Sequence, residues 1–195
     1  MNKLTRDDLY TLEAYARERP QFRARVIAHK QTRTVHVGAH IVLLFEDRLT
    51  IQYQIQEMLR IERIFEPAGI QDELDAYNPL IPDGANLKAT MFIEYADPTE
   101  RAARLAELSG IERTVSLRIG TLAPIAAIAD EDLDRSTETK TSAVHFLRFE
   151  LSAEHAAEFR NGTSTSIGIE HRAYRAEAAL EGATLCALAA DLTAN

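Results

Sequence analysis

The sequence has few of the residues and motifs that form disulfides, metal clusters or nucleotide-binding loops. Cys186 is the single cysteine among 195 residues, so an internal disulfide cannot form and a zinc cluster of several cysteines is excluded. Tryptophan is absent, and the eight glycines are scattered, which leaves neither a glycine-rich phosphate loop nor a dinucleotide-binding fingerprint. No group of histidines and carboxylates follows metal-ligand spacing on one element. We therefore expect no cofactor and no metal ion.

Long apolar runs and an excess of basic residues are also missing. No apolar stretch reaches the roughly 20 residues that span a bilayer, and residues 1–8 lack the apolar core of a secretory signal. These absences predict a cytoplasmic protein without a membrane segment. A net charge of −8 at pH 7 argues against a nucleic-acid partner, because binding phosphates requires a basic surface. Basic side chains do concentrate in residues 1–40. They indicate either a docking surface for an acidic partner or an arm that folds back on the acidic remainder, and we favour the arm.

The first half of the chain is predicted to be mainly helical. Helical spacing of apolar residues predicts one helix that ends at Pro20 and a second over about 21–30. Alternation of polar and apolar residues then predicts a β-hairpin over about 34–45. A long helix follows over residues 48–66, and Pro67 stops it.

The second half alternates between strands and helices. Strands are expected near residues 88–95, 114–119, 124–129, 144–151 and 164–170, and helices begin after Asp97 and Ser152. Residues 88–171 thus have the order of a ferredoxin-like β-α-β-β-α-β sheet with one inserted strand. We predict a single α+β domain over residues 1–175. Residues 176–195 are expected to form an Ala-rich helical tail whose removal leaves the domain folded.

A row of polar side chains on the long helix is the main candidate site. Tyr53, Gln56, Glu57 and Arg60 lie on successive turns of one face and offer a phenol, an amide, a carboxylate and a guanidinium. This set suits the binding of a polar or anionic ligand, or acid–base chemistry if burial shifts the pKa of Glu57. The alternative is a solvated helix face with a Glu57–Arg60 ion pair, which is the commoner arrangement.

Glu62 is a second candidate because of its neighbours on the helical wheel. It projects into an apolar arc formed by Ile51, Ile55, Met58, Leu59, Ile61 and Phe65. A buried carboxylate requires a cationic partner or a proton. The wheel therefore predicts that Glu62 is buried and paired, either as a structural ion pair or as a functional group.

Several segments of the sequence carry a resemblance to a known family. They are KLTRDDL at residues 3–9, RVIAHK at 25–30, FEDR at 45–48, QYQIQEMLRIE at 52–62, DAYNPLIPDG at 75–84, SAVHFLRF at 142–149 and IEHRAY at 169–174. Over about residues 3–175 the chain resembles a bacterial family known only as a domain of unknown function. The resemblance implies no catalytic residues. It implies a gene neighbourhood, in which such proteins are often encoded beside rubrerythrin-like and iron–sulfur oxidoreductase-like proteins.

Two functional hypotheses remain open, and we favour the first. The first is a non-catalytic accessory or interaction subunit that works with rubrerythrin-like or iron–sulfur proteins in peroxide or oxygen defence. The second is a small-molecule-binding protein, or a cofactor-independent enzyme, that uses the polar face of the helix at residues 48–66. A closed pocket containing Glu57 and Arg60 favours the second hypothesis, and an exposed flat face there favours the first.

Overall fold

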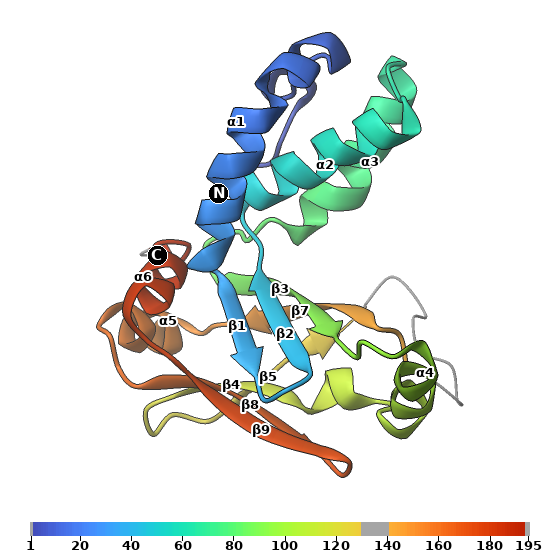
Figure 1. Cartoon of the computed structure of the whole chain (residues 1–195). Coiled ribbons are helices and arrows are strands. Elements are labelled where there is room, and N and C mark those ends of the chain that lie inside the picture. Colours follow the sequence, from blue (N-terminus) through green and yellow to red (C-terminus); the bar gives the residue numbers. More distant parts are fainter. Residues whose placement is uncertain (1, 130–140, 194–195) are drawn as a thin grey trace.

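Two antiparallel sheets and a group of three helices make up the molecule (Figure 1). The computed structural model describes residues 2–129 and 141–193. The α+β class expected from the sequence is confirmed. The main hydrophobic core lies between the two sheets, and two smaller cores lie among the helices.

Sheet A has the strand order β1-β2-β3-β7-β6. Its strands are β1 (Thr34–Val37), β2 (Ile41–Phe45), β3 (Asn86–Ile93), β7 (Val144–Glu150) and β6 (Ile128–Ala129). All neighbouring strands in it are antiparallel. Every residue of β2 is buried, so both faces of this sheet are covered at β2.

Sheet B has the order β5-β4-β8-β9 and is antiparallel as well. It consists of β5 (Ile125–Ala126), β4 (Val115–Ile119), β8 (Thr165–His171) and β9 (Tyr174–Leu180). Alternating side chains of β4 and β8 point into the core between the sheets, as Leu117 and Ile167 do with no exposed surface. Residues 125–129 therefore contribute a short strand to each sheet, with β5 in sheet B and β6 in sheet A.

Helices α1 (Leu12–Gln31), α2 (Arg48–Glu62) and α3 (Pro67–Tyr77) form an arm that stands above the sheets (Figure 1). The arm has its own core, in which Ile51, Ile55 and Leu59 of α2 pack with Leu74 of α3. The remaining helices α4 (Pro98–Glu107), α5 (Ala153–Arg160) and α6 (Gly182–Ala189) lie at the ends of the sheets. Short 3₁₀ turns occupy Arg6–Asp8, Asn78–Leu80 and Ile111–Thr114.

A buried arginine joins the arm to the sheets. Arg33 is only 2% exposed, and its guanidinium donates to the carbonyl oxygens of Phe45 at 2.9 Å and Glu46 at 3.2 Å. It also pairs with Asp191 near the C-terminal end and with Asp47 at 3.5 Å. A buried charge requires partners of this kind. Arg33, together with Arg19 at Glu57, is thus directed at acidic groups of the same chain, as the folded-back arm predicts for these two residues.

The expected ferredoxin-like sheet at residues 88–171 is wrong in its topology. The order of strands and helices is as predicted, but β3 and β7 lie in sheet A whereas β4 and β8 lie in sheet B. Each β-α-β unit therefore crosses from one sheet to the other. The physical reason is burial. Apolar side chains from both sheets pack together in one core, and two sheets packed face to face bury these side chains from both sides.

The C-terminal segment also differs from the helical tail expected at residues 176–195. Residues 174–180 are strand β9, which pairs with β8 along its whole length, and from there to residue 193, where the described part ends, only Gly182–Ala189 is helical. Leu180, Leu188 and Leu192 are buried in the main core. Half-buried Ala176 and Ala178 alternate with exposed Arg175 and Glu177 in β9, so this period-two pattern outweighs the helix propensity of alanine.

Two helix boundaries were also predicted wrongly. Pro20 lies inside the continuous helix α1 instead of ending it. Proline has a φ that suits a helix, and its lost hydrogen bond is offset by the packing of Tyr15, Phe22 and Val26 on either side. Helix α2 ends at Glu62, where Arg63 adopts a left-handed conformation with φ of 56°.

Candidate functional site

The predicted polar face of α2 lies against α1. Gln56 has no exposed surface, and its amide accepts from the Tyr10 backbone N–H at 2.5 Å and donates to the Tyr10 carbonyl at 3.4 Å. The ring of Tyr53 packs on that of Phe22, with centroids 5.9 Å apart. Thus the face is neither a closed pocket nor a flat exposed surface, since it holds the N-terminal segment and α1 in place.

Glu57 is the centre of this interface. Its carboxylate accepts two hydrogen bonds from Arg19 at 2.8 Å each, one from the Tyr15 hydroxyl at 2.7 Å, and two from Arg60 at 3.2 Å and 3.4 Å. The bonds from Arg19 above all, aided by those of Tyr15 and Arg60, lower the pKa of Glu57 to about 2. Burial and the carboxylate together raise the pKa of the Tyr15 phenol. The predicted Glu57–Arg60 pair is present, and a ligand-binding role for the four residues stays a prediction.

The expected burial of Glu62 is wrong. Glu62 is exposed, and so are Ile61 with 61% and Phe65 with 67% of their surfaces. The buried stripe of α2 contains Thr50, Ile51, Ile55, Gln56 and Leu59. The wheel misplaced the core face because α2 ends at Glu62, so that Phe65 belongs to the loop before α3 and does not extend the helical arc.

A cavity of about 180 Å³ lies where the arm meets the outer face of sheet A. Its floor consists of two rows of side chains across β2, β3 and β7, set by the strand register. Leu44 pairs with Thr90 and Thr90 with Phe146, while Phe92 lies beside Val144 in the neighbouring row. The floor is therefore largely apolar and aromatic, with the Thr90 hydroxyl as its polar group.

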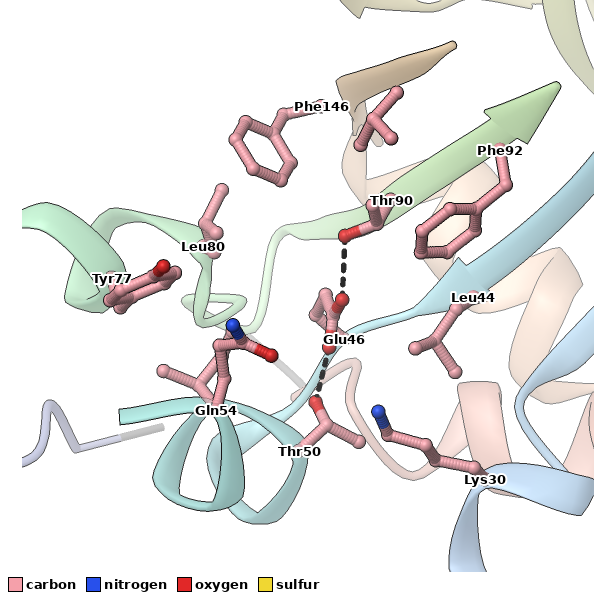
Figure 2. Close-up of a pocket in the computed structure, with 12 residues that line it drawn as sticks. Lys30, Leu44, Glu46, Thr50, Gln54, Tyr77, Leu80, Thr90, Phe92 and Phe146 are labelled. Carbon is pink, nitrogen blue, oxygen red and sulfur yellow. Dashed lines mark hydrogen bonds between the residues drawn. The ribbon is translucent and has the colours of Figure 1, made fainter. Parts of the chain in front are cut away.

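The first two turns of α2 form the opposite wall. Asp47 caps this helix, since its carboxylate accepts from the backbone N–H groups of Leu49 at 3.0 Å and Thr50 at 2.9 Å. The cap fixes the direction in which α2 leaves β2, and it turns Thr50, Ile51 and Gln54 towards the cavity. Tyr77 and Leu80 close the side formed by the end of α3 and the turn after it (Figure 2).

Glu46 is the buried acid of the cavity. It follows β2 directly, and only 8% of its surface is exposed. Its two oxygens accept hydrogen bonds from the hydroxyls of Thr50 at 2.5 Å and Thr90 at 2.6 Å (Figure 2). Burial raises the pKa of Glu46, while the two hydroxyls and the charge of Lys30 lower it in part. Such short contacts are typical of hydrogen bonds to an ionised carboxylate.

Within the part of the chain that the structure describes, Glu46 forms no ion pair. Lys30 lines the same cavity, but its ammonium lies 5.7 Å from the centroid of the Tyr53 ring and likewise forms no ion pair with a described residue. Each Glu46 oxygen retains a lone pair after accepting one hydroxyl. A carboxylate that is buried beside a cavity, with hydrogen bonds but with no ion pair to a described residue, is suited to receive a donor from a ligand.

No metal centre is apparent in the described regions. Residues 2–129 and 141–193 contain no group of three or more histidine, cysteine, aspartate or glutamate side chains placed to hold a metal ion. Across the same residues, no helix has both the length and the apolar character that crossing a membrane demands.

Sequence reasoning missed Glu46, Thr50 and Thr90 as site residues. A signal was available in the strands on either side. Residues 41–45 are apolar without alternation, and Phe92 and Phe146 are aromatic residues at outward positions of their strands. Such a pattern indicates that something covers both faces of the sheet. An acid directly after that strand is then a candidate for burial.

Comparison with known proteins places this two-sheet protein with its helical arm in a family. The model of the family described as "Protein of unknown function (DUF3501)" matches residues 3–192, and the chain belongs to this family. The match includes the C-terminal segment after residue 175. A search of curated proteins finds no match.

A solved structure has the same fold. It is the crystal structure, at 1.90 Å resolution, of a novel protein of unknown function from Burkholderia pseudomallei K96243. The two sequences are 56% identical, the match covers 98% of this chain and 100% of that one, and the TM-score is 0.94. The arm and both sheets are thus similar to those of a bacterial protein.

Proposed function

We propose that this protein binds a small molecule in the cavity between α2 and the outer face of sheet A. The observation that carries the proposal is Glu46, a buried carboxylate beside an apolar and aromatic cavity. Binding sites are commonly apolar hollows with a few fixed polar groups that orient the ligand. Here Thr50 and Thr90 fix the carboxylate from two sides.

The volume limits the size of the ligand. An engineered protein cavity of about 150 Å³ binds benzene, and this cavity measures about 180 Å³. We infer a ligand with one ring or a short branched chain. The site uses α2, as in our second hypothesis from the sequence, but a different face of it from the one that carries Glu57 and Arg60.

A fragment screen by ligand-observed NMR tests the proposal. We expect small aromatic and aliphatic fragments to bind the parent protein. Val144→Trp, which places a large ring in the cavity, should abolish that binding. The control is Ala179→Trp, which adds the same ring at an exposed position of β9. Equal binding by the parent and Val144→Trp would contradict the proposal.

The accessory role in peroxide or oxygen defence, our first hypothesis from the sequence, stays a prediction. Co-purification of rubrerythrin-like or iron–sulfur proteins with the tagged chain from its native host tests it. The two roles are compatible, because a bound ligand could accompany a partner. Recovery of no such protein from the host would leave the cavity as the better-supported role.

A further inference from the structure

We infer that the cavity ligand is a small organic ammonium whose charged nitrogen pairs with Glu46 and whose apolar body packs on Phe92 and Phe146. The inference rests on the proposed function and names its chemical class. It follows from the carboxylate of Glu46, which is buried at the cavity without an ion-paired cation from the described residues. Glu46 is buried with two hydroxyl donors and, among the described residues, no ion-paired cation.

The carboxylate lacks the partner that comparable groups in this chain possess. Glu57 has two arginines, and Asp47 has Arg33 together with His29, whose Nε2 lies 2.5 Å from its carboxylate. Burying an ionised group without a counter-charge is costly. The corresponding position beside Glu46 is open cavity, so a ligand cation there would satisfy the free lone pairs.

The surrounding side chains suit a cation that carries an apolar body. Phe92, Phe146 and Tyr77 line the cavity, and aromatic faces attract ammonium groups. A primary ammonium has three N–H donors, enough for Glu46 and for a neighbouring oxygen such as that of Gln54. A carboxylate ligand would instead meet Glu46 as a like charge.

Lys30 is the group that opposes the inference, and it provides a sharp test. Its ammonium leans over the Tyr53 ring and forms no ion pair with Glu46. Lys30 and Glu46 line the same cavity with opposite charges, so substitutions of the two residues should change amine binding in opposite directions. Removing Lys30 should strengthen the binding of an amine, and removing the charge of Glu46 should weaken it. If Lys30 were the recognition group for an anion, Lys30→Gln would weaken binding instead.

The experiment compares three probes with the same ring, namely benzylamine, benzyl alcohol and benzoate. Calorimetry and amide chemical shifts of Thr50 and Thr90 are recorded for the parent at pH 7.5. We expect benzylamine to bind at least tenfold more tightly than benzyl alcohol, and benzoate not to bind. Glu46→Gln should reduce benzylamine affinity tenfold or more, and Lys30→Gln should raise it several-fold. Glu154→Gln, at an exposed position of α5, is the control and should change nothing.

Each result decides a different claim. Equal binding of benzylamine and benzyl alcohol, or tighter binding of benzoate, overturns the ammonium class and leaves the ligand-binding proposal standing. If none of the three probes binds while the fragment screen finds other ligands, the class is again wrong. If neither experiment finds a ligand, both proposals fail. Should Glu46→Gln not fold, the parent's chemical shifts with the three probes decide alone.

Discussion

Two glutamates near α2, Glu46 and Glu57, have opposite electrostatic surroundings. Glu46, before α2, is buried with hydroxyl donors, and burial raises its pKa. Glu57, inside α2, is surrounded by Arg19, Tyr15 and Arg60, and these partners lower its pKa to about 2. The two residues therefore affect the free energy of unfolding in separate pH ranges and in opposite senses.

Glu46→Gln should stabilise the protein at alkaline pH. A raised folded-state pKa means that the contribution of Glu46 to stability is complete below its ordinary pKa of 4.5 and is lost as pH rises through the folded value. Lys30 and Asp47 are the other charged groups that act on it. Urea unfolding gives the difference in free energy of unfolding between the variant and the parent. This difference should shift in favour of the variant by more than about 0.5 kcal/mol between pH 5 and pH 8. A variant that is less stable than the parent at pH 8 would show that the hydroxyl bonds outweigh burial.

Glu57→Gln should destabilise the protein at neutral pH and less so in acid. The depressed folded-state pKa makes the contribution of Glu57 complete above 4.5, and this contribution is lost as pH falls towards about 2. Loss of hydrogen bonds to a charged group costs about 1.5–3 kcal/mol. We expect that difference in urea unfolding at pH 7, and a smaller one at pH 3. Glu62→Gln, on the exposed end of α2, is the matched control and should stay within about 0.5 kcal/mol.

At the residue scale, contacts within one helix could be predicted from the sequence, and contacts between elements could not. The pairing of Glu57 with Arg60 follows from helical spacing alone. The pairing of Glu57 with Arg19 joins residues 38 positions apart and depends on how α1 packs on α2. The apolar strand before Glu46 could have indicated that this residue is buried. Its hydrogen bond from Thr90 could not be predicted, because β2 and β3 pair across 44 residues of sequence.

At the scale of elements, the C-terminal segment shows most clearly how the spacing of buried residues determines secondary structure. Ala176 and Ala178 are half-buried in β9, while Arg175, Glu177 and Ala179 on either side of them are exposed. The helix α6 that follows covers the end of the main core with Leu188 and, just beyond it, Leu192. The order of helices and strands was predictable from caps such as Asp97 and Ser152. The division of the strands between two sheets was not, because pairing partners lie far apart in sequence.

Leu188→Ala tests whether this segment belongs to the core. Leu188 has no exposed surface, and removing a buried leucine side chain costs about 2–5 kcal/mol. We expect a loss of that size in chemical unfolding. Truncation after Leu180 should abolish cooperative unfolding, contrary to the expectation from sequence alone. Cys186→Ala, exposed on the same helix, should leave stability unchanged within about 0.5 kcal/mol. A stable truncated protein would show that α6 is dispensable.

At the scale of the whole molecule, Arg33 sets how the arm stands on the sheets. Its planar guanidinium reaches two backbone carbonyls and two carboxylates together. Lysine would keep the charge but could not reproduce this fork. The cavity lies at the same junction, so the direction of the arm also sets its width.

Arg33→Lys should therefore loosen the arm as well as destabilise the protein. Lysine keeps the charge but cannot reach all four acceptors, and leaving a buried acceptor without its donor costs about 1–3 kcal/mol. Spin labels at Glu62 and Glu170, in a Cys186→Ala background, report the distance from the arm to sheet B. We expect a broader distance distribution in the variant than in the parent. Arg172→Lys, at an exposed turn, should give the parent distribution, and an unchanged width in Arg33→Lys would assign the junction to other contacts.

The bond between Arg33 and Asp191 joins residues 158 positions apart, and this has a consequence for how the chain is made. Ribosomes add about 5–20 residues per second, so Asp191 is synthesised roughly 8–30 s after Arg33. During that time the arginine has Asp47 and the carbonyls of Phe45 and Glu46, but not its most distant carboxylate. The hairpin and arm emerge from the ribosome first, and the junction closes only after α6 has been translated.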